Sequence, residues 1–447
     1  MYDAAISRLS KAVTYATVSN RDESKVDWSQ FTGFHRFLEE SYPLVHKAFQ
    51  REVVGKASLL YRWKGTGKGK PFAFLAHMDV VPVPPEDLPD WKYPPFSGYN
   101  DGTYIWGRGA ADMKVELIAI LETLERLIGE GFVPTRDLYL CFGHNEEVMA
   151  EPSGAQQIAD LLKERGVELE FVLEEAGVVM MDPPFGLKRP LAMIGVAEKG
   201  YGDLEITLKG EGGHSAEPEG RSVVEEMARL VTALYDHPPP YRITPTVETY
   251  VKGLAGELSP QEREALSSRE AVCQTLRENK KTHAMVRTTI VPTVVRAGMA
   301  SNAIPSEAAV LVNARLLPGD TMDTVTDHIR RLADDLHLSA RLQMRVRTQS
   351  PPPPETPTDT PTYGILKEAY RLWDERLLVV PYIVTGGTDS KHYTQVTREI
   401  YRISPFRSYA GQPSGAHGKN EHTSIQGFLE AQTFLRRVIL MENSREA

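Results

Sequence analysis

The chain has 447 residues, enough for two or three domains with substantial cores. Hydrophobic residues make up 41% and charged residues 25%, a composition that excludes wholesale disorder. The formal net charge of −9 argues against a general nucleic-acid binder, and no run approaches the roughly 18 apolar residues of a membrane span. We therefore expect neither a nucleic-acid partner nor a membrane-embedded segment.

The N-terminal residues do not resemble a secretory signal, because no basic start precedes an apolar stretch. The two cysteines, Cys141 and Cys273, are too few for a disulfide framework. Both fit better as small apolar residues of the interior. These features predict a globular protein of the cytoplasm.

The first half of the chain alternates short apolar runs with segments of helical periodicity. Strands are predicted at 71–76, 137–142 and 169–173, with helices over 113–128 and after Ser153, a suitable N-cap. Alternating strands and helices imply right-handed crossovers, so we predict an α/β domain with a mostly parallel sheet flanked by helices. Ligands of such sheets bind beyond the carboxyl ends of the strands.

A second pattern begins near Lys199. Leu204, Ile206 and Leu208 alternate with polar residues, as in a sheet with one solvated face. A helix over 222–235 follows, and further segments are predicted as a strand ending near Arg315, a helix over 322–336 and a strand over 341–347. The order strand–helix–strand, repeated, predicts an α+β sandwich. The region 237–289 shows no clear pattern.

The proline-rich run over 351–361 reads as a stiff link back to the first domain. We therefore expect a catalytic domain divided by an inserted domain. The predicted boundaries are 1–198 for the first part, 199–348 for the inserted domain and 349–447 for the second part.

Acidic residues and histidines gather where the predicted strands end. His77 and Asp79 can lie together after the first strand, because alternate residues of a strand share a side. Asp112 stands before a predicted helix, where an ordinary N-cap is the alternative to a metal ligand. Glu146 and Glu147 follow the next strand, and a solvated acidic turn is the alternative there.

Further clusters are the glutamate pair Glu174–Glu175, the histidine of GGHSAEP and the histidine of GAHGKNE. Each of these residues alone fits a surface or core position. Together they form a set of nitrogen and oxygen ligands without cysteine, which suits zinc, with manganese or cobalt as substitutes. Five such ligands with one bridging carboxylate describe a hydrolytic site for two metal ions.

These motifs resemble the di-zinc aminoacylase/carboxypeptidase family, metallopeptidase family 20. The stretch HMDVVPVPPEDLPDWKYPPFSGYNDGTYIWGRGAADMK is most similar to the branch of carboxypeptidase S and the Gly-X carboxypeptidases, and so is GGTDSKHY. The resemblance runs in order from about residue 6 to residue 425. It implies a zinc-peptidase catalytic domain and an inserted domain that serves as a lid and a dimerisation surface.

The resemblance assigns roles to the residues of the catalytic domain. Two of these residues have roles other than metal binding: Asp79 orients a histidine ligand, and Glu146 is the general base. The metal ligands that it implies are His77, the bridging Asp112, Glu147, Glu174 in preference to Glu175, and His417.

The inserted domain is expected to contact the substrate. His214 matches a histidine that reaches the substrate carbonyl, in some members from the partner subunit. Arg315 matches an arginine that holds the substrate carboxylate, and Asn302 matches a nearby polar contact. A surface charge at a strand edge is the alternative for Arg315. The resemblance also implies a homodimer formed through this domain.

The predicted function is hydrolysis of an amide bond next to a free carboxylate, as in a carboxypeptidase or dipeptidase acting on small peptides. A water shared by two zinc ions attacks the amide, and Glu146 is the general base. An N-acyl-amino-acid deacylase with the same site is the nearer alternative. A non-catalytic metal-binding dimer is the more distant one, and the presence of Glu146 and of every expected ligand disfavours it.

Overall fold

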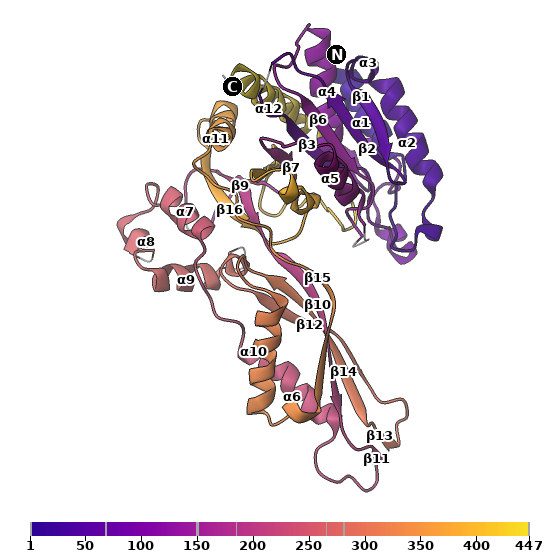
Figure 1. Ribbon diagram of the computed structural model, residues 1–447, viewed down its shortest axis with the longest axis vertical. Coiled ribbons are helices and arrows are strands. Elements are labelled where there is room, and N and C mark those ends of the chain that lie inside the picture. Colours follow the sequence, from indigo (N-terminus) through magenta and orange to yellow (C-terminus); the bar gives the residue numbers. More distant parts are fainter. Residues whose placement is uncertain are drawn as a thin grey trace. The chain divides into compact units, whose positions relative to one another are not determined.

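The computed structural model describes residues 2–67, 69–148, 152–184, 186–264, 266–279 and 282–445 (Figure 1). Contacts within the chain divide it into two compact units. Unit 1 comprises Met1–Val196, Thr356–Pro381 and Thr388–Ala447, and unit 2 comprises Ala197–Glu355 and Tyr382–Gly387. The sequence predicted domain boundaries after residues 198 and 348. In the structure, the corresponding boundaries between the units fall after residues 196 and 355. The catalytic and lid roles of the two units remain predictions.

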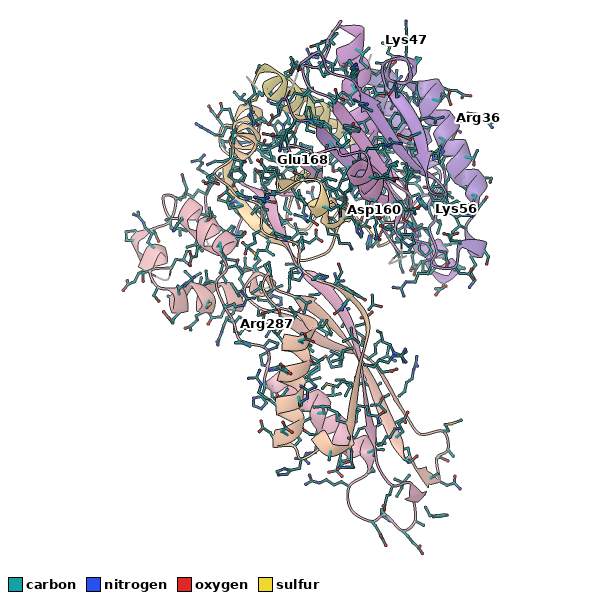
Figure 2. All side chains as sticks on the ribbon, viewed as in Figure 1. Arg36, Lys47, Lys56, Asp160, Glu168 and Arg287 are labelled. Carbon is teal, nitrogen blue, oxygen red and sulfur yellow. The ribbon has the colours of Figure 1, made fainter. Side chains whose placement is uncertain are left out.

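Unit 1 is an α/β structure in which helices cover both faces of a large sheet. Its longer helices are α1 (Tyr2–Val13), α2 (Trp28–Ser41), α3 (Pro43–Ala48), α4 (Lys114–Gly129), α5 (Gly154–Glu164), α11 (Pro361–Trp373) and α12 (Ile425–Ser444). The 3₁₀ segments are η1 (Glu23–Lys25), η2 (Pro85–Asp90) and η5 (Asp389–Gln395). Charged side chains such as Arg36 of α2, Lys47 and Glu168 lie on the outside of this unit (Figure 2).

The strands of the large sheet are β1 (Gln50–Val54), β2 (Ser58–Trp63), β3 (Phe72–His77), β6 (Leu138–Gly143), β7 (Val172–Glu174), β8 (Val178–Met180), β9 (Leu191–Glu198), β16 (Leu378–Val384), β17 (Ile400–Arg402) and β18 (Arg407–Ser408). Their order is β1-β2-β6-β3-β7-β17-β9-β8-β18, with β16 beside β9. The central run β6-β3-β7-β17 is parallel, and antiparallel pairs flank it. The predicted α/β fold with a mostly parallel central sheet is confirmed.

Alternation along the strands fills two separate cores. In β3, Phe72 and Phe74 point into the core that contains α1, α4 and α12. Ala73 and Leu75 point to the opposite face, where Ile158 of α5 packs. Because successive strand residues face opposite sides, an uninterrupted apolar run marks a strand covered on both faces. This pattern allowed the sequence to predict β3 and β6.

Unit 1 also contains a smaller sheet, which pairs segments that lie far apart along the chain. Its strands are β4 (Tyr99–Asn100), β5 (Tyr104–Trp106) and β19 (His422–Ser424), in the order β19-β5-β4. His422 pairs with Trp106 although more than 300 residues separate them along the chain. This sheet therefore places the loop before β19 beside the turn that follows β5.

Unit 2 contains an antiparallel sheet in the order β12-β14-β10-β15 and a two-stranded β11-β13 pair. The strands are β10 (Gly200–Lys209), β11 (Gly213–His214), β12 (Thr289–Ala297), β13 (Ala303–Ile304), β14 (Glu307–Leu316) and β15 (Leu342–Ser350). The helices are α6 (Val223–Asp236), α7 (Pro245–Leu254), α8 (Pro260–Glu264), α9 (Arg269–Glu278) and α10 (Met322–Asp335). Leu204, Ile206 and Leu208 of β10 share one core with α6 and α10.

The region 237–289, which gave no pattern in the sequence, contains α7, α8 and α9. These helices are short. α7 buries Thr246, Val247, Tyr250 and Leu254, whereas α9 buries two side chains, those of Val272 and Leu276. A stripe of two apolar residues in ten is too weak to reveal a helix from the sequence. Among the described helices, none is long and apolar enough to cross a membrane.

Candidate metal centre

Three neighbouring parallel strands end at one edge of the unit 1 sheet. β3 ends at His77, β6 ends at Gly143 just before the segment with Glu146 and Glu147, and β7 ends at Glu174. Because β6, β3 and β7 are adjacent and parallel, the residues that follow them meet in space. This is the edge at which ligands of α/β sheets bind.

Two groups of candidate ligands meet at this edge and share Asp112. In the first group, His77 Nε2 lies 3.1 Å from Asp112 Oδ1 and 3.4 Å from Glu175 Oε1. In the second, His417 Nε2 lies 3.0 Å from Asp112 Oδ2 and 2.9 Å from Glu147 Oε2. The ligand atoms of each group lie within 4.8 Å of one another. We call these groups the first and second triads.

Asp79 is fully buried beneath the first triad. His77 Nδ1 lies 3.0 Å from the Asp79 carbonyl oxygen and 3.5 Å from its carboxylate. The carboxylate accepts hydrogen bonds from Ser19 Oγ at 2.6 Å and from the N–H groups of Glu146 and Glu147 at 3.1 Å each. Burial opposes ionisation, but the bonds from His77 and Ser19 hold the pKa of Asp79 below its usual value. Asp79 thus fixes both the imidazole and the glutamate segment.

Asp112 does not serve as the cap of α4. The helix begins after Met113, and no side chain caps it. The Asp112 carboxylate instead faces both triad histidines. Burial would raise the pKa of Asp112, but His417 and His77 lower it well below its usual range. The N-cap alternative considered for this residue therefore does not match its position.

Glu174 and Glu175 occupy different environments. Glu174 is 1% exposed, and its Oε2 accepts a hydrogen bond from the Ser390 N–H at 2.8 Å. Burial raises the pKa of Glu174, while Thr388, Ser390 and Arg402 oppose that rise. Glu175, the next residue, turns to His77. The sequence favoured Glu174 as the ligand, but the geometry favours Glu175, because the strand ends at Glu174 and successive residues point apart.

Replacing each of these glutamates separately tests this reassignment. We expect Glu175→Gln to weaken zinc binding by more than the roughly 10–100-fold that contacts outside the ligand set contribute. Glu174→Gln keeps both metal equivalents, because its amide retains an oxygen for the Ser390 N–H. Chelator competition with each purified variant measures both affinities. Loss of metal from Glu174→Gln, with Glu175→Gln unaffected, would restore the original assignment.

Glu146 lies among carboxylates at the same edge. Its pKa is raised well above its usual range by burial and by Asp389, Glu175 and Glu147, with His77 opposing. Asp389 is itself 7% exposed, and burial together with Glu174 raises its pKa. The sequence motif GGTDSKHY contains Asp389, but a resemblance without an assigned role did not identify it as part of the site.

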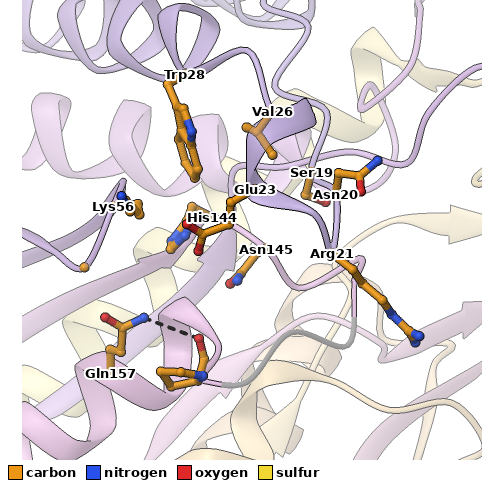
Figure 3. A pocket seen from close by; sticks show the side chains of 12 residues that line it. Ser19, Asn20, Arg21, Glu23, Val26, Trp28, Lys56, His144, Asn145 and Gln157 are labelled. Atoms are coloured by element: carbon orange, nitrogen blue, oxygen red, sulfur yellow. Dashed lines mark hydrogen bonds between the residues drawn. The ribbon is translucent and has the colours of Figure 1, made fainter.

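His144 belongs to a separate pocket of about 610 Å³ (Figure 3). Its Nδ1 lies 2.6 Å from Ser58 Oγ, its ring packs 5.9 Å from that of Trp28, and burial lowers its pKa. The pocket is lined by Ser19, Asn20, Arg21, Glu23, Val26, Trp28, Gly55, Lys56, His144, Asn145, Pro152 and Gln157. No triad residue lines it, so His144 is placed outside the candidate metal centre.

The residues predicted in the inserted domain fall at two places in unit 2. His214 of β11 pairs with Ala303 of β13, and the Ser215 N–H donates to the Asn302 carbonyl at 3.2 Å. His214 and Asn302 are therefore neighbours. Arg315 instead lies near the end of β14, opposite Tyr201 of β10, with its guanidinium 4.8 Å from the Tyr201 ring.

Two cations near Arg315 were missed in the sequence. Lys199 is 2% exposed, and its Nζ donates to the Arg287 carbonyl at 2.9 Å and the Ala284 carbonyl at 3.2 Å. Burial, followed by the charges of Arg287 and Arg315, lowers the pKa of Lys199 to about 7. Arg287, labelled in Figure 2, lies two residues before the start of β12. No motif marks Lys199 or Arg287, because the chain brings them to Arg315 only through folding.

An α/β sheet with two carboxylate–histidine triads at its carboxyl edge is the arrangement expected of a metal-dependent hydrolase. The chain belongs to peptidase family M20/M25/M40, whose family model matches residues 73–441. This membership confirms the resemblance seen in the sequence and makes the protein an enzyme of a metallopeptidase family.

Three relatives illustrate the similarity. The chain is 32% identical to a probable carboxypeptidase S-like protein 2 of Dictyostelium discoideum, over 97% of this chain and 84% of that protein. It is 34% identical to the N-fatty-acyl-amino acid synthase/hydrolase PM20D1 of Mus musculus, over 96% and 85% respectively. The M20 family metallo-carboxypeptidase Sso-CP2 of Sulfolobus solfataricus shares the fold, with a TM-score of 0.71, 18% identity, and coverage of 98% and 99%.

Proposed function

We propose that this enzyme hydrolyses an amide bond next to a free carboxylate, with two zinc ions held by the two triads. One observation carries the proposal: Asp112 offers one carboxylate oxygen to each triad. The proposed ligands are His77, Asp112, Glu147, Glu175 and His417.

The donor set fits such a metal pair. It consists of imidazole nitrogens and carboxylate oxygens, which zinc accepts and which manganese and cobalt also tolerate. His77 is held from its other nitrogen by Asp79, the usual arrangement for a metal-ligating histidine. When bound, a metal pair polarises the amide carbonyl and lowers the pKa of water toward 7.

Glu146 is the proposed general base. It takes a proton from the attacking water and delivers it to the leaving nitrogen, the usual role of a carboxylate in general acid–base catalysis. The hydrogen bond from the Glu146 N–H to Asp79 holds the backbone of this residue in place.

The proposed carboxylate site is the group of Arg315, Lys199 and Arg287. The planar fork of Arg315 suits bidentate contact with a carboxylate, and the charges of Arg287 and Arg315 both act on the buried Lys199 beside them. This group explains why the substrate would need a free carboxylate. The contact of the Arg315 guanidinium with the Tyr201 ring supports this role over the alternative of a surface charge at a strand edge.

His214 and Asn302 are proposed to contact the substrate carbonyl. They stand beyond the Glu307 end of β14, whereas Arg315 stands near its other end (Figure 1). Eight residues separate Glu307 from Arg315, which at about 3.3 Å per residue is roughly 26 Å. One small substrate cannot span that distance, so we propose that His214 acts on the site of a partner subunit.

A homodimer formed through unit 2 is therefore part of the proposal. The edge strand β12 exposes Val291, Val294 and Val295, with Val295 59% exposed. An exposed apolar edge strand is a ready surface for a second copy. Co-expression of Glu146→Gln with His214→Ala tests this arrangement. Activity in the mixture, with none in either variant alone, supports sharing of sites, and an inactive mixed dimer contradicts it.

The chemistry of the acyl side distinguishes two substrate classes. Small peptides are the first candidate, in agreement with the carboxypeptidase S-like relative. N-acyl amino acids are the second, in agreement with the N-fatty-acyl-amino acid synthase/hydrolase. Both leave a free carboxylate on the amino-acid side and need the same triads.

A hydrolysis panel tests the proposed function. Chelator-stripped enzyme is assayed with blocked dipeptides and N-acyl amino acids, with and without added zinc, manganese or cobalt. We expect metal-dependent turnover that is lost when the terminal carboxylate is amidated. Turnover of the amidated substrates at the same rate would refute the carboxylate requirement, and no turnover despite two bound equivalents would favour a binding protein.

A location in the cytoplasm is also proposed. Cys141 is buried, Cys273 is half-buried, and neither forms a disulfide. Fractionation of cells of the source organism would test this expectation directly.

A further inference from the structure

Two buried residues outside both triads join the turn that carries Asp112 to the loop that carries His417. The side chain of Arg108 is 3% exposed and that of Glu421 is 0% exposed. Arg108 Nη1 donates to Glu421 Oε2 at 2.6 Å. We call this contact the Arg108–Glu421 pair.

Each member of the pair also holds the backbone of the other segment. Glu421 Oε1 accepts hydrogen bonds from the N–H of Ala111 at 2.9 Å and from that of Asp112 itself at 3.1 Å. Arg108 Nη2 donates to the carbonyl of Gly418, the residue after His417, at 3.0 Å. The contact is therefore reciprocal, and it ends at the backbone beside a candidate ligand on both sides.

The His417 loop needs such support. The His417 side chain is 59% exposed, so packing does little to hold it. The backbone at His417 has φ +58°, a left-handed conformation that is unfavourable for a residue other than glycine. A loop in such a conformation persists only when its surroundings fix it. The contacts that reach the backbone next to His417 include the hydrogen bond that Arg108 donates to the Gly418 carbonyl.

A buried ion pair is a weak source of stability, because the cost of removing two charges from water offsets most of their attraction. A positional role accounts better for this one. The geometry points to the Arg108–Glu421 pair as the element that sets the spacing between Asp112 and His417, and with it the affinity of the second triad for its metal ion. Both are positioning residues, and the inference rests on the proposed two-metal site.

Glu421→Gln tests the inference directly. The amide keeps one oxygen for the Ala111 and Asp112 N–H groups but presents an NH₂ group to Arg108, so the pair is broken. We expect zinc affinity for the second equivalent to fall about 10–100-fold, the usual effect of losing a contact that orients a ligand, with the first equivalent unchanged. Competition between stripped enzyme and a chromophoric zinc chelator measures each equivalent. Activity lost at limiting zinc should return with excess zinc.

Glu442→Gln is the matched control. Glu442 is also 0% exposed and forms a buried ion pair with Arg136 in the same unit, at 3.4 Å. Arg136 precedes β6, at the end of the strand opposite to the metal centre, and Glu442 lies in α12. Loss of the Arg136–Glu442 pair should lower the melting temperature, as the loss of any buried ion pair would, while both zinc affinities stay unchanged.

Arg108→Lys provides a second variant if Glu421→Gln does not fold, because it keeps the charge and removes the fork that reaches Gly418. Selective weakening of the second equivalent in either variant supports the inference. Equal weakening of both equivalents, or unchanged affinities in a folded variant, overturns it. If the unaltered enzyme binds fewer than two zinc ions, the proposed two-metal site fails, and that result is visible before any variant is compared.

Discussion

Replacing Glu146 by glutamine lowers kcat by roughly 10²–10⁴-fold, the usual contribution of a general acid–base residue. The amide cannot accept a proton, whereas the backbone N–H bond to Asp79 and both triads remain. KM and the content of bound zinc should therefore change little. Steady-state kinetics with the best substrate of the panel, together with metal analysis of the same sample, measures all three quantities.

His144→Gln is a suitable control for this variant. It alters the same segment between β6 and α5, but His144 faces Ser58 and the pocket of Figure 3. It should keep most of the activity. A Glu146→Gln enzyme whose kcat stays within tenfold of the unaltered one would remove Glu146 from the role of base.

Replacing Asp112 by alanine removes one ligand from each triad at once. We expect both zinc equivalents to bind weakly, and turnover to fall at least about 10³-fold, because the loss of metal catalysis costs several kcal/mol of transition-state stabilisation. No other described residue belongs to both triads. Isothermal titration of stripped enzyme with zinc, followed by assay, measures the two effects.

His417→Ala is the comparison for Asp112→Ala. It removes a ligand from the second triad alone, so one zinc equivalent should bind as in the unaltered enzyme. Identical metal stoichiometry in the two variants would contradict the shared position of Asp112.

Much of the fold could be predicted from the sequence because several helices and strands have strong, regular hydrophobic patterns. The strands of the central sheet are continuous apolar runs, and Ser153 and Ser222 cap α5 and α6, as expected of serines before helical periodicity. The helices α7–α9 were missed in the sequence. The periodicity of α9 is faint because this helix buries two side chains, whereas Val247, Tyr250 and Leu254 of α7 are buried at helical spacing.

The candidate site was readable only in part. The resemblance to metallopeptidase family 20 indicated four of the five proposed ligands, namely His77, Asp112, Glu147 and His417. The choice between Glu174 and Glu175 depends on which side chain points away from the sheet at the last residue of β7, which periodicity does not decide. Asp389 and Glu421 lie in motifs that were noted without a role for these two residues, and Lys199 and Arg287 reach Arg315 only through folding.

The interrupted order of unit 1 has a consequence for biosynthesis. β17 lies between β7 and β9, yet it is translated only after the whole of unit 2 has been made. Until then the nascent chain carries β7 as an unpaired edge, a condition that invites aggregation and calls for chaperones. The loop with His417 emerges later still. In the proposed two-metal site, the second triad is therefore completed after the first, whose residues all precede unit 2.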